Sequence, residues 1–176
     1  MRPWRFLFCV APAVAVACAE ISDTDYSSFA DIPAEGMPQG WEFVFNPTQS
    51  DSAAILSGHH DVVVVARYTN ECHSRSISLD IEEISFSNPT PATTRVEIDL
   101  FGDDGRPLGT GVYGVYEIAD TIHRQIEIAD GYSIAVSSPL QSTQTRGMKA
   151  IGIVIPRSGS RPVIPIPEFK GVPGRR

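Results

Sequence analysis

Apolar residues recur at every second position along much of this 176-residue chain, and this pattern constrains its fold more than any other feature. A period of two sends alternate side chains to opposite faces of a β-sheet. Residues 62–68 form a nearly continuous, largely β-branched apolar run, which indicates a strand buried on both faces. The sequence therefore predicts an all-β protein.

We expect about eight strands separated by turn residues, arranged as an antiparallel β-sandwich of the jelly-roll or immunoglobulin-like kind. The expected strands lie within residues 41–45, 62–68, 77–86, 96–100, 109–118, 122–128, 132–137 and 150–155. The alternation shifts at Glu82-Glu83, which predicts a β-bulge that keeps Ile84 and Phe86 facing inward. Residues 51–56 are the expected place for a short helix.

The start of the chain has the features of an export signal. Arg2 and Arg5 precede an apolar run at residues 6–17, and Cys18 follows the small residues of Ala15-Val16-Ala17. This pattern predicts a lipoprotein signal peptide at residues 1–17 and lipidation of Cys18, so that acyl chains attach the rest of the protein to a membrane of the cell envelope.

Two alternatives to lipidation stay open. Cleavage after an Ala-x-Ala pattern would leave a secreted protein that begins at an unmodified Cys18. A retained membrane anchor is disfavoured, because about 12 apolar residues at ~1.5 Å each reach only ~18 Å of a ~30 Å hydrocarbon core. Pro12 also interrupts the run.

Composition divides the remainder into three parts. Residues 18–40 are rich in Asp, Ser, Pro and Gly and are expected to be a tether that docks a few apolar side chains. Residues 41–156 form the predicted sandwich domain, and 157–176 a Pro-rich basic tail. Residues 18–156 contain seven basic and twenty acidic residues, against five and one in the tail. An acidic body repels phosphates, so no nucleic-acid partner is expected.

The sequence contains no residue set with the spacing of a catalytic or metal site, so we expect a protein that is not an enzyme and has no cofactor. The adjacent His59 and His60 would point to opposite faces of a strand, which disfavours a shared metal ion. The acidic residues before Gly105 lack calcium-loop spacing and indicate a hairpin turn. Cys72 is expected to be a structural thiol rather than a nucleophile.

Three aromatic residues are candidates for contacting a ligand or partner. Tyr113 and Tyr116 lie near Gly109 and Gly111, and Trp41 lies elsewhere in the chain. Glycine within a strand marks a bulge or a close approach of another chain or ligand. A glycan could stack on such rings. The alternative is that aromatics at alternating strand positions belong to the core.

Several segments, taken together, resemble the gliding-motility lipoprotein H (GldH) family of Bacteroidetes. The matching segments comprise Tyr26, Phe29, Ile32-Pro33 and Gly36 leading into Trp41 and Phe43, then 105–111, 131–134 and 147–155. The chain departs from the family at Ser138-Pro139-Leu140-Gln141, where members tend to have a His-x-Met-Arg-like sequence, and in its Pro-rich tail.

The resemblance implies a β-sandwich lipoprotein of the cell envelope, at the outer membrane on its periplasmic or surface face. It implies a non-enzymatic accessory or scaffold role in gliding motility or the linked secretion machinery, with envelope protein partners. Cys18 is the acceptor that it identifies, and no catalytic residue is carried over. A surface glycan-binding lipoprotein is the alternative function.

Overall fold

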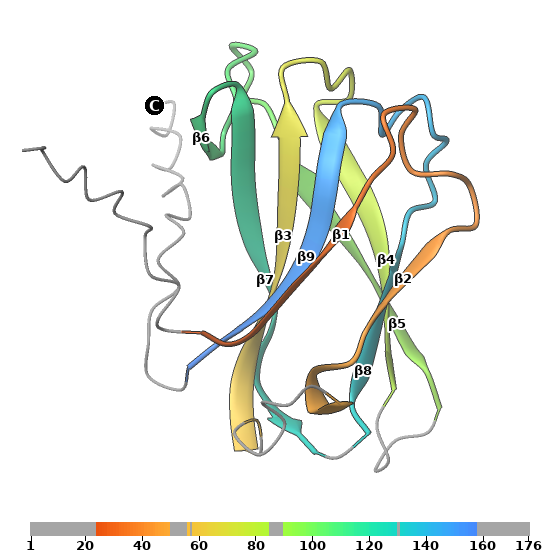
Figure 1. The fold of residues 1–176 in the computed structure, drawn as a ribbon, viewed down its shortest axis with the longest axis vertical. Helices are drawn as coiled ribbons and strands as arrows, with labels where there is room; N and C mark the ends of the chain where they lie inside the picture. The colour runs from red at the N-terminus through yellow and green to blue at the C-terminus, as the bar shows by residue number, and fades with distance from the viewer. Residues whose placement is uncertain (1–23, 50–55, 57, 85–89, 130, 158–176) are drawn as a thin grey trace, which may run out of the picture.

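The computed structural model describes residues 24–49, 56, 58–84, 90–129 and 131–157. Within them the chain forms nine strands and one short 3₁₀ helix (Figure 1). The elements are β1 (Thr24–Asp31), β2 (Glu42–Phe45), η1 (Pro47–Gln49), β3 (Gly58–Thr69), β4 (Ser76–Ile84), β5 (Ala92–Asp99), β6 (Thr110–Val112), β7 (Val115–Ile128), β8 (Ser133–Ser137) and β9 (Met148–Pro156).

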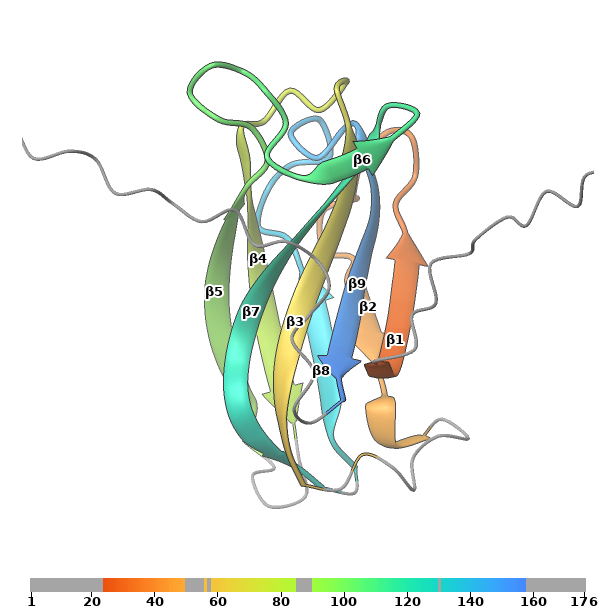
Figure 2. The same ribbon diagram turned by 90° about the vertical axis from the view of Figure 1, so that its left-hand side faces the viewer.

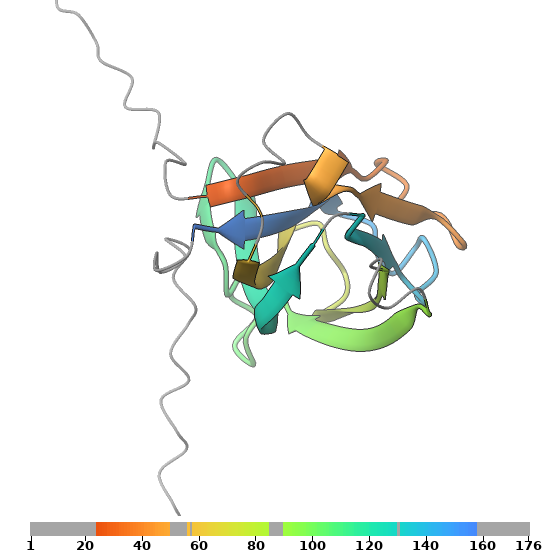
Figure 3. The same cartoon turned by 90° about the horizontal axis from the view of Figure 1, so that it is seen from below.

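The strands form two sheets, and every pair of neighbours is antiparallel. The first sheet has the order β1-β9-β3-β7-β6 and the second the order β2-β8-β4-β5. Figure 2 shows the two layers along their strands, and Figure 3, seen from below, shows β1 beside β9 in the first sheet. The expected antiparallel β-sandwich is therefore confirmed.

β3 is the central strand of the first sheet and is buried on both faces, as its sequence predicts. Val62, Val64 and Tyr68 face the main core between the sheets, while Val63 and Val65 join a smaller cluster on the outer face. The inward residues of the second sheet complete the main core. They include Phe45, Ile77, Leu79, Ile81, Ile98, Ile134 and Val136.

The outer cluster is covered by an aromatic ring from β1. Phe29 lies opposite Gly152 in the strand register, and a Cβ atom at Gly152 would collide with the Phe29 ring. The Arg67 guanidinium carbon lies 3.8 Å from the centre of that ring, and Arg67 Nε donates to Glu117 Oε2 at 2.6 Å. This cation–π contact explains why an arginine occurs within the apolar run of β3.

The expectation that residues 18–40 form a tether is wrong for the part that the structure describes. Thr24–Asp31 is β1, which pairs with β9 along its length, and Tyr26 and Ala30 pack against the main core. Ile32 and Met37 in the following loop are buried, so the expected docking of apolar side chains is confirmed. The described part of the sandwich therefore starts at Thr24 rather than at Trp41.

The strands expected at 109–118 and 122–128 are also corrected. The first segment is a hairpin, with β6 and β7 joined by a turn at Tyr113 and Gly114, whose φ angles are 55° and 80°. β7 then continues for 14 residues through the second segment. Its register against β3 shifts twice, near Val62, and Gln125 has a φ angle of 53°. Bulges let one long strand replace the two expected ones.

The prediction of a β-bulge at Glu82-Glu83 is wrong, because no bulge forms there. The register of β4 with both β5 and β8 runs through these residues without a shift. Ile84 is therefore exposed, while Glu83 is largely buried beside Tyr132. Phe86 lies outside the described residues, as does most of the helix expected at 51–56.

Candidate functional site

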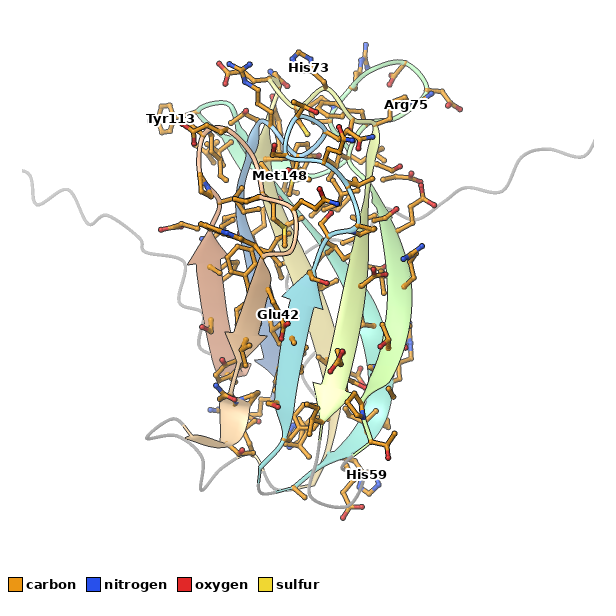
Figure 4. The ribbon with its side chains drawn as sticks, turned by 90° about the vertical axis from the view of Figure 1, so that its right-hand side faces the viewer. Glu42, His59, His73, Arg75, Tyr113 and Met148 are labelled. Carbon is orange, nitrogen blue, oxygen red and sulfur yellow. The ribbon has the colours of Figure 1, made fainter. Side chains whose placement is uncertain are left out.

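The two ends of the sandwich differ in the loops they carry. We call the upper end in Figure 1 the pocket end, because the β3–β4 loop, the β5–β6 loop and the β6–β7 turn lie there. The other end, where β3 and β8 begin, we call the opposite end. Figure 4 places His73, Arg75 and Tyr113 at the pocket end and His59 at the opposite end.

A pocket of about 290 Å³ lies between the β3–β4 and β5–β6 loops. Both loops contribute to its wall. The lining residues are Asn70, Cys72, His73, Arg75, Phe101, Gly102, Asp103 and Gly105. The pocket therefore combines polar side chains, one aromatic ring and two glycines.

Backbone hydrogen bonds hold the two loops together. The carbonyl of Arg75 accepts bonds from the N–H groups of Leu100 and Phe101, at 2.7 and 3.1 Å. Within the β5–β6 loop, the Gly105 N–H donates to the Gly102 carbonyl at 3.0 Å, which closes the turn expected from the sequence. Gly105 has a φ angle of 75°, a conformation that glycine adopts without steric cost.

An aromatic layer supports the pocket from below. The ring of Tyr68 contacts Phe101 edge to face, with 5.4 Å between ring centroids, and lies 5.7 Å from the ring of Tyr116. The Tyr68 hydroxyl donates to the Leu100 carbonyl at 2.6 Å and accepts from the Gly109 N–H at 3.0 Å. Burial raises the pKa of Tyr68, so the hydroxyl stays neutral and keeps both bonds.

The charged side chains of the pocket form a neutral pair. Arg75 Nη2 lies 2.6 Å from Asp103 Oδ1, and both side chains are exposed to solvent. Asn70 Nδ2 lies 3.5 Å from the hydroxyl of Tyr116, which links the pocket rim to β7. The pocket therefore presents several hydrogen-bond donors and acceptors without a net charge from this pair.

Cys72 is buried beneath the pocket wall and agrees with the expectation of a structural thiol. Burial raises its pKa, which disfavours the thiolate form that nucleophilic catalysis requires. A Cβ atom at Gly147 would collide with the backbone of Cys72, so the β8–β9 loop packs closely against this segment.

The structure separates the three aromatic residues singled out in the sequence. Trp41 is 46% exposed in the β1–β2 loop and packs edge to face on Phe43. Tyr116 is partly buried against Tyr68 in the aromatic layer. Tyr113 is 101% exposed at the turn of the β6–β7 hairpin. The three rings therefore do not form one stacking platform.

Tyr113 belongs to an exposed apolar protrusion. We call residues Val112, Tyr113, Gly114 and Val115 the hairpin tip. Val112 is 70% and Val115 40% exposed. Cβ atoms at Gly109 and Gly111 would come within 2.5 Å of carbonyl oxygens of β7, so glycine allows β6 to lie close against that strand. The segment that comes close to these glycines is β7 of the same chain, rather than the other chain or ligand that the sequence suggested.

The opposite end carries a different set of polar residues. The Tyr132 hydroxyl donates to Glu83 Oε1 at 2.6 Å, and His123 Nε2 lies 3.0 Å from Glu83 Oε2. Burial, followed by the bond to Glu83, raises the pKa of Tyr132. The carboxylate of Glu83 is thereby held between two side chains from β7 and the start of β8.

The histidines and the cysteine at the two ends of the sandwich do not converge on one site. His59 lies at the opposite end, and Cys72 and His73 at the pocket end (Figure 4). In the part of the chain that the structure describes, no three His, Cys, Asp or Glu residues are grouped so that they could hold a metal ion.

The expected lipidation site, Cys18, and the signal peptide lie outside the described residues. None of the helices within the described ranges is long and apolar enough to cross a membrane.

Comparison with known proteins identified no matching family and no matching curated sequence. One similar solved structure is the X-ray crystal structure of a carbohydrate-binding module, CBM28, specific for non-crystalline cellulose. It has 15% sequence identity and a TM-score of 0.33, over 74% of this chain and 72% of that one. We base neither the fold nor the function on a similarity of this size.

Proposed function

We propose that the chain is a non-enzymatic lipoprotein of the cell envelope that docks a protein partner through its hairpin tip, as an accessory or scaffold component. The resemblance described above suggests gliding motility or the linked secretion machinery as its setting. The observation that carries the proposal is the exposure of Val112, Tyr113 and Val115 on one protruding turn.

The hairpin tip has the composition of an interface anchor. Residues 110–116 contain no charged side chain, although the chain has a net charge of −7. Tyrosine is enriched among the residues that contribute most to protein–protein binding, because it offers a large rigid ring with few torsions to order. The tip therefore supplies apolar contact area on an exposed turn.

The conformation of Tyr113 supports a role in binding. Its φ angle of 55° lies in the left-handed region, where hairpin turns favour Asn, Asp or Gly and a tyrosine costs free energy. A ring that is fully exposed regains nothing by packing within the same chain. Contact with a partner would compensate for this local cost.

The shape of the tip favours a protein over a glycan as its occupant. A convex turn can insert into a concave apolar site on a partner, whereas a sugar ring needs a pocket or a platform of neighbouring side chains. Trp41 and Tyr116 do not extend the tip into such a platform, because one lies in another loop and the other is packed against Tyr68.

The position of β1 would orient a lipid-anchored domain. Five residues separate Cys18 from Thr24 and can span at most about 20 Å, at ~3.3–3.6 Å per residue. β1 starts in the lower half of Figure 1 and runs toward the pocket end for eight residues, about 26 Å at ~3.3 Å each. An anchor at Cys18 would therefore present the hairpin tip away from its membrane.

The test is recovery of partners with a tagged, full-length protein from its source bacterium after mild crosslinking. Tyr113→Asn removes the ring but suits the left-handed turn, so the hairpin is retained. Val44→Ser is the matched control, since Val44 is 56% exposed on β2 and lies outside the tip. We expect the wild type and Val44→Ser to recover the same envelope protein and Tyr113→Asn to lose it. Equal recovery with Tyr113→Asn, or recovery of the tagged protein alone, would refute the proposal.

A further inference from the structure

We propose that the pocket between the β3–β4 and β5–β6 loops binds a neutral carbohydrate of one or two sugar rings. This function is separate from docking through the hairpin tip, because it depends on Asn70, Arg75, Phe101 and Asp103. Neither proposal requires the other.

The size of the pocket limits the ligand. Its volume of about 290 Å³ lies just below the ~300–1,000 Å³ range of small-molecule sites. The pocket is open to solvent, since Arg75 in the β3–β4 loop and Asp103 in the β5–β6 loop both have exposed side chains. A short or terminal sugar unit fits this space, with any further units extending into solvent.

The polar groups suit hydroxyls rather than an ion. Arg75 donates hydrogen bonds and Asp103 accepts them, and the two side chains lie 2.6 Å apart. A sugar hydroxyl both donates and accepts, so two neighbouring hydroxyls could bridge such a pair. The side-chain amide of Asn70 has both functions in one group. A phosphate or carboxylate could reach the Arg75 guanidinium only beside Asp103, whose like charge already neutralises that arginine, and this disfavours an anionic ligand.

Phe101 supplies the apolar part of the site. Its side chain is partly buried, lines the pocket and is held by the edge-to-face contact with Tyr68. The C–H groups on one face of a sugar ring are apolar and pack against such a ring. One aromatic beside convergent donors and acceptors is the usual combination in a pocket for a small polar ligand.

The walls of the pocket are already ordered. Besides the bonds to the Arg75 carbonyl, the Gly102 N–H donates to the Arg106 carbonyl at 2.8 Å and the Leu108 N–H to the Leu100 carbonyl at 2.9 Å. Phe101 also pairs with Pro107 in an isolated antiparallel β-bridge. Loops fixed in this way lose little conformational entropy when a ligand binds, which favours affinity.

The experiment uses the purified full-length chain on an array of neutral and acidic oligosaccharides, followed by calorimetric titration with the best neutral ligand. We expect Arg75→Gln and Phe101→Leu each to weaken binding at least tenfold. Arg106→Gln is the matched control, because Arg106 pairs with Asp104 at 3.4 Å in the same loop but does not line the pocket. We expect its affinity to stay within twofold of wild type.

Three outcomes would overturn the proposal. The first is absence of any neutral ligand on the array, and the second is selective binding of acidic glycans. The third is equal loss in Arg75→Gln and Arg106→Gln, which would indicate a general charge effect. Because Leu in place of Phe101 could loosen the loop, the unfolding temperature of each variant is measured alongside. Arg75→Gln keeps both bonds to the main-chain carbonyl and loses only a solvent-exposed pair with Asp103, so it decides the result if Phe101→Leu is unstable.

Discussion

The pocket end and the opposite end of the sandwich both gather polar and aromatic side chains, but they place them differently. At the opposite end, Glu83, Tyr132 and His123 make their contacts with one another. At the pocket end, Arg75 and Asp103 project into solvent and Tyr113 packs on nothing within the described chain. Side chains whose contacts are internal contribute to stability, whereas exposed ones at a protruding end are available to ligands.

The largest effect on stability is expected for Tyr132→Phe at the opposite end. It removes the donor to a largely buried carboxylate, and hydrogen bonds to charged groups contribute about 1.5–3 kcal/mol. We expect the free energy of unfolding, measured by urea denaturation, to fall by about 2 kcal/mol. Binding at the pocket end should not change in the folded variant. A variant as stable as the wild type would show that the buried bond contributes little.

A smaller effect of the opposite sign is expected from Tyr113→Asn at the pocket end. Asn adopts the left-handed conformation more readily than Tyr, and the ring has no packing to lose. The same urea experiment should show a gain of up to about 1 kcal/mol. Val112→Asn serves as the control, since Val112 is also exposed, at 70%, but lies in β6. A loss of stability in Tyr113→Asn would mean that the ring does pack within the chain.

The smallest effect is expected for the exposed pair on the second sheet. Arg95 donates to both carboxylate oxygens of Asp80, at 2.7 and 3.0 Å, and this hydrogen bond lowers the pKa of Asp80. The folded pKa lies below the unfolded value of about 3.9, so the pair stabilises the fold above that pH. Its contribution is lost as the pH falls through the lowered pKa.

Arg95→Gln tests this pair. The variant should be slightly less stable than the wild type at neutral pH and equally stable once Asp80 is protonated in both states, as measured by denaturation across a pH series. Solvent screens the pair, so added salt should reduce the difference. A difference that grows toward acid pH would contradict the assignment.

The sheets could be predicted from the sequence because their inward residues recur with a period of two. β3 and β4 follow that pattern clearly, whereas β1 does not, since Tyr26, Ser28 and Ala30 on its core face are only weakly apolar. Its strand structure depends on pairing with β9, more than a hundred residues away. The bulge predicted at Glu83 failed for a similar reason, because distant Tyr132 and His123 make an inward carboxylate acceptable.

Less of the candidate site could be predicted. Tyr113 was singled out in the sequence and is fully exposed, and its role in contact stays a prediction. Asn70, Arg75 and Phe101 were missed because each is ordinary in its own loop. The turn at Gly102 and Gly105 was recognised. The β4–β5 pairing, which places Ser76 opposite Asp99, could have indicated that this turn adjoins the β3–β4 loop. Only their juxtaposition creates the pocket.

The position of β9 has a consequence for how the protein folds. β9, the last strand in the described chain, lies between β1, the first, and β3. The N-terminal strand therefore cannot join its sheet until nearly the whole domain has been synthesised and, if it is exported, has crossed the membrane. Pairing of such distant segments gives a high contact order, which slows folding. Until then the free edge of β3 can pair with other chains, so a nascent or truncated form is the species most exposed to aggregation.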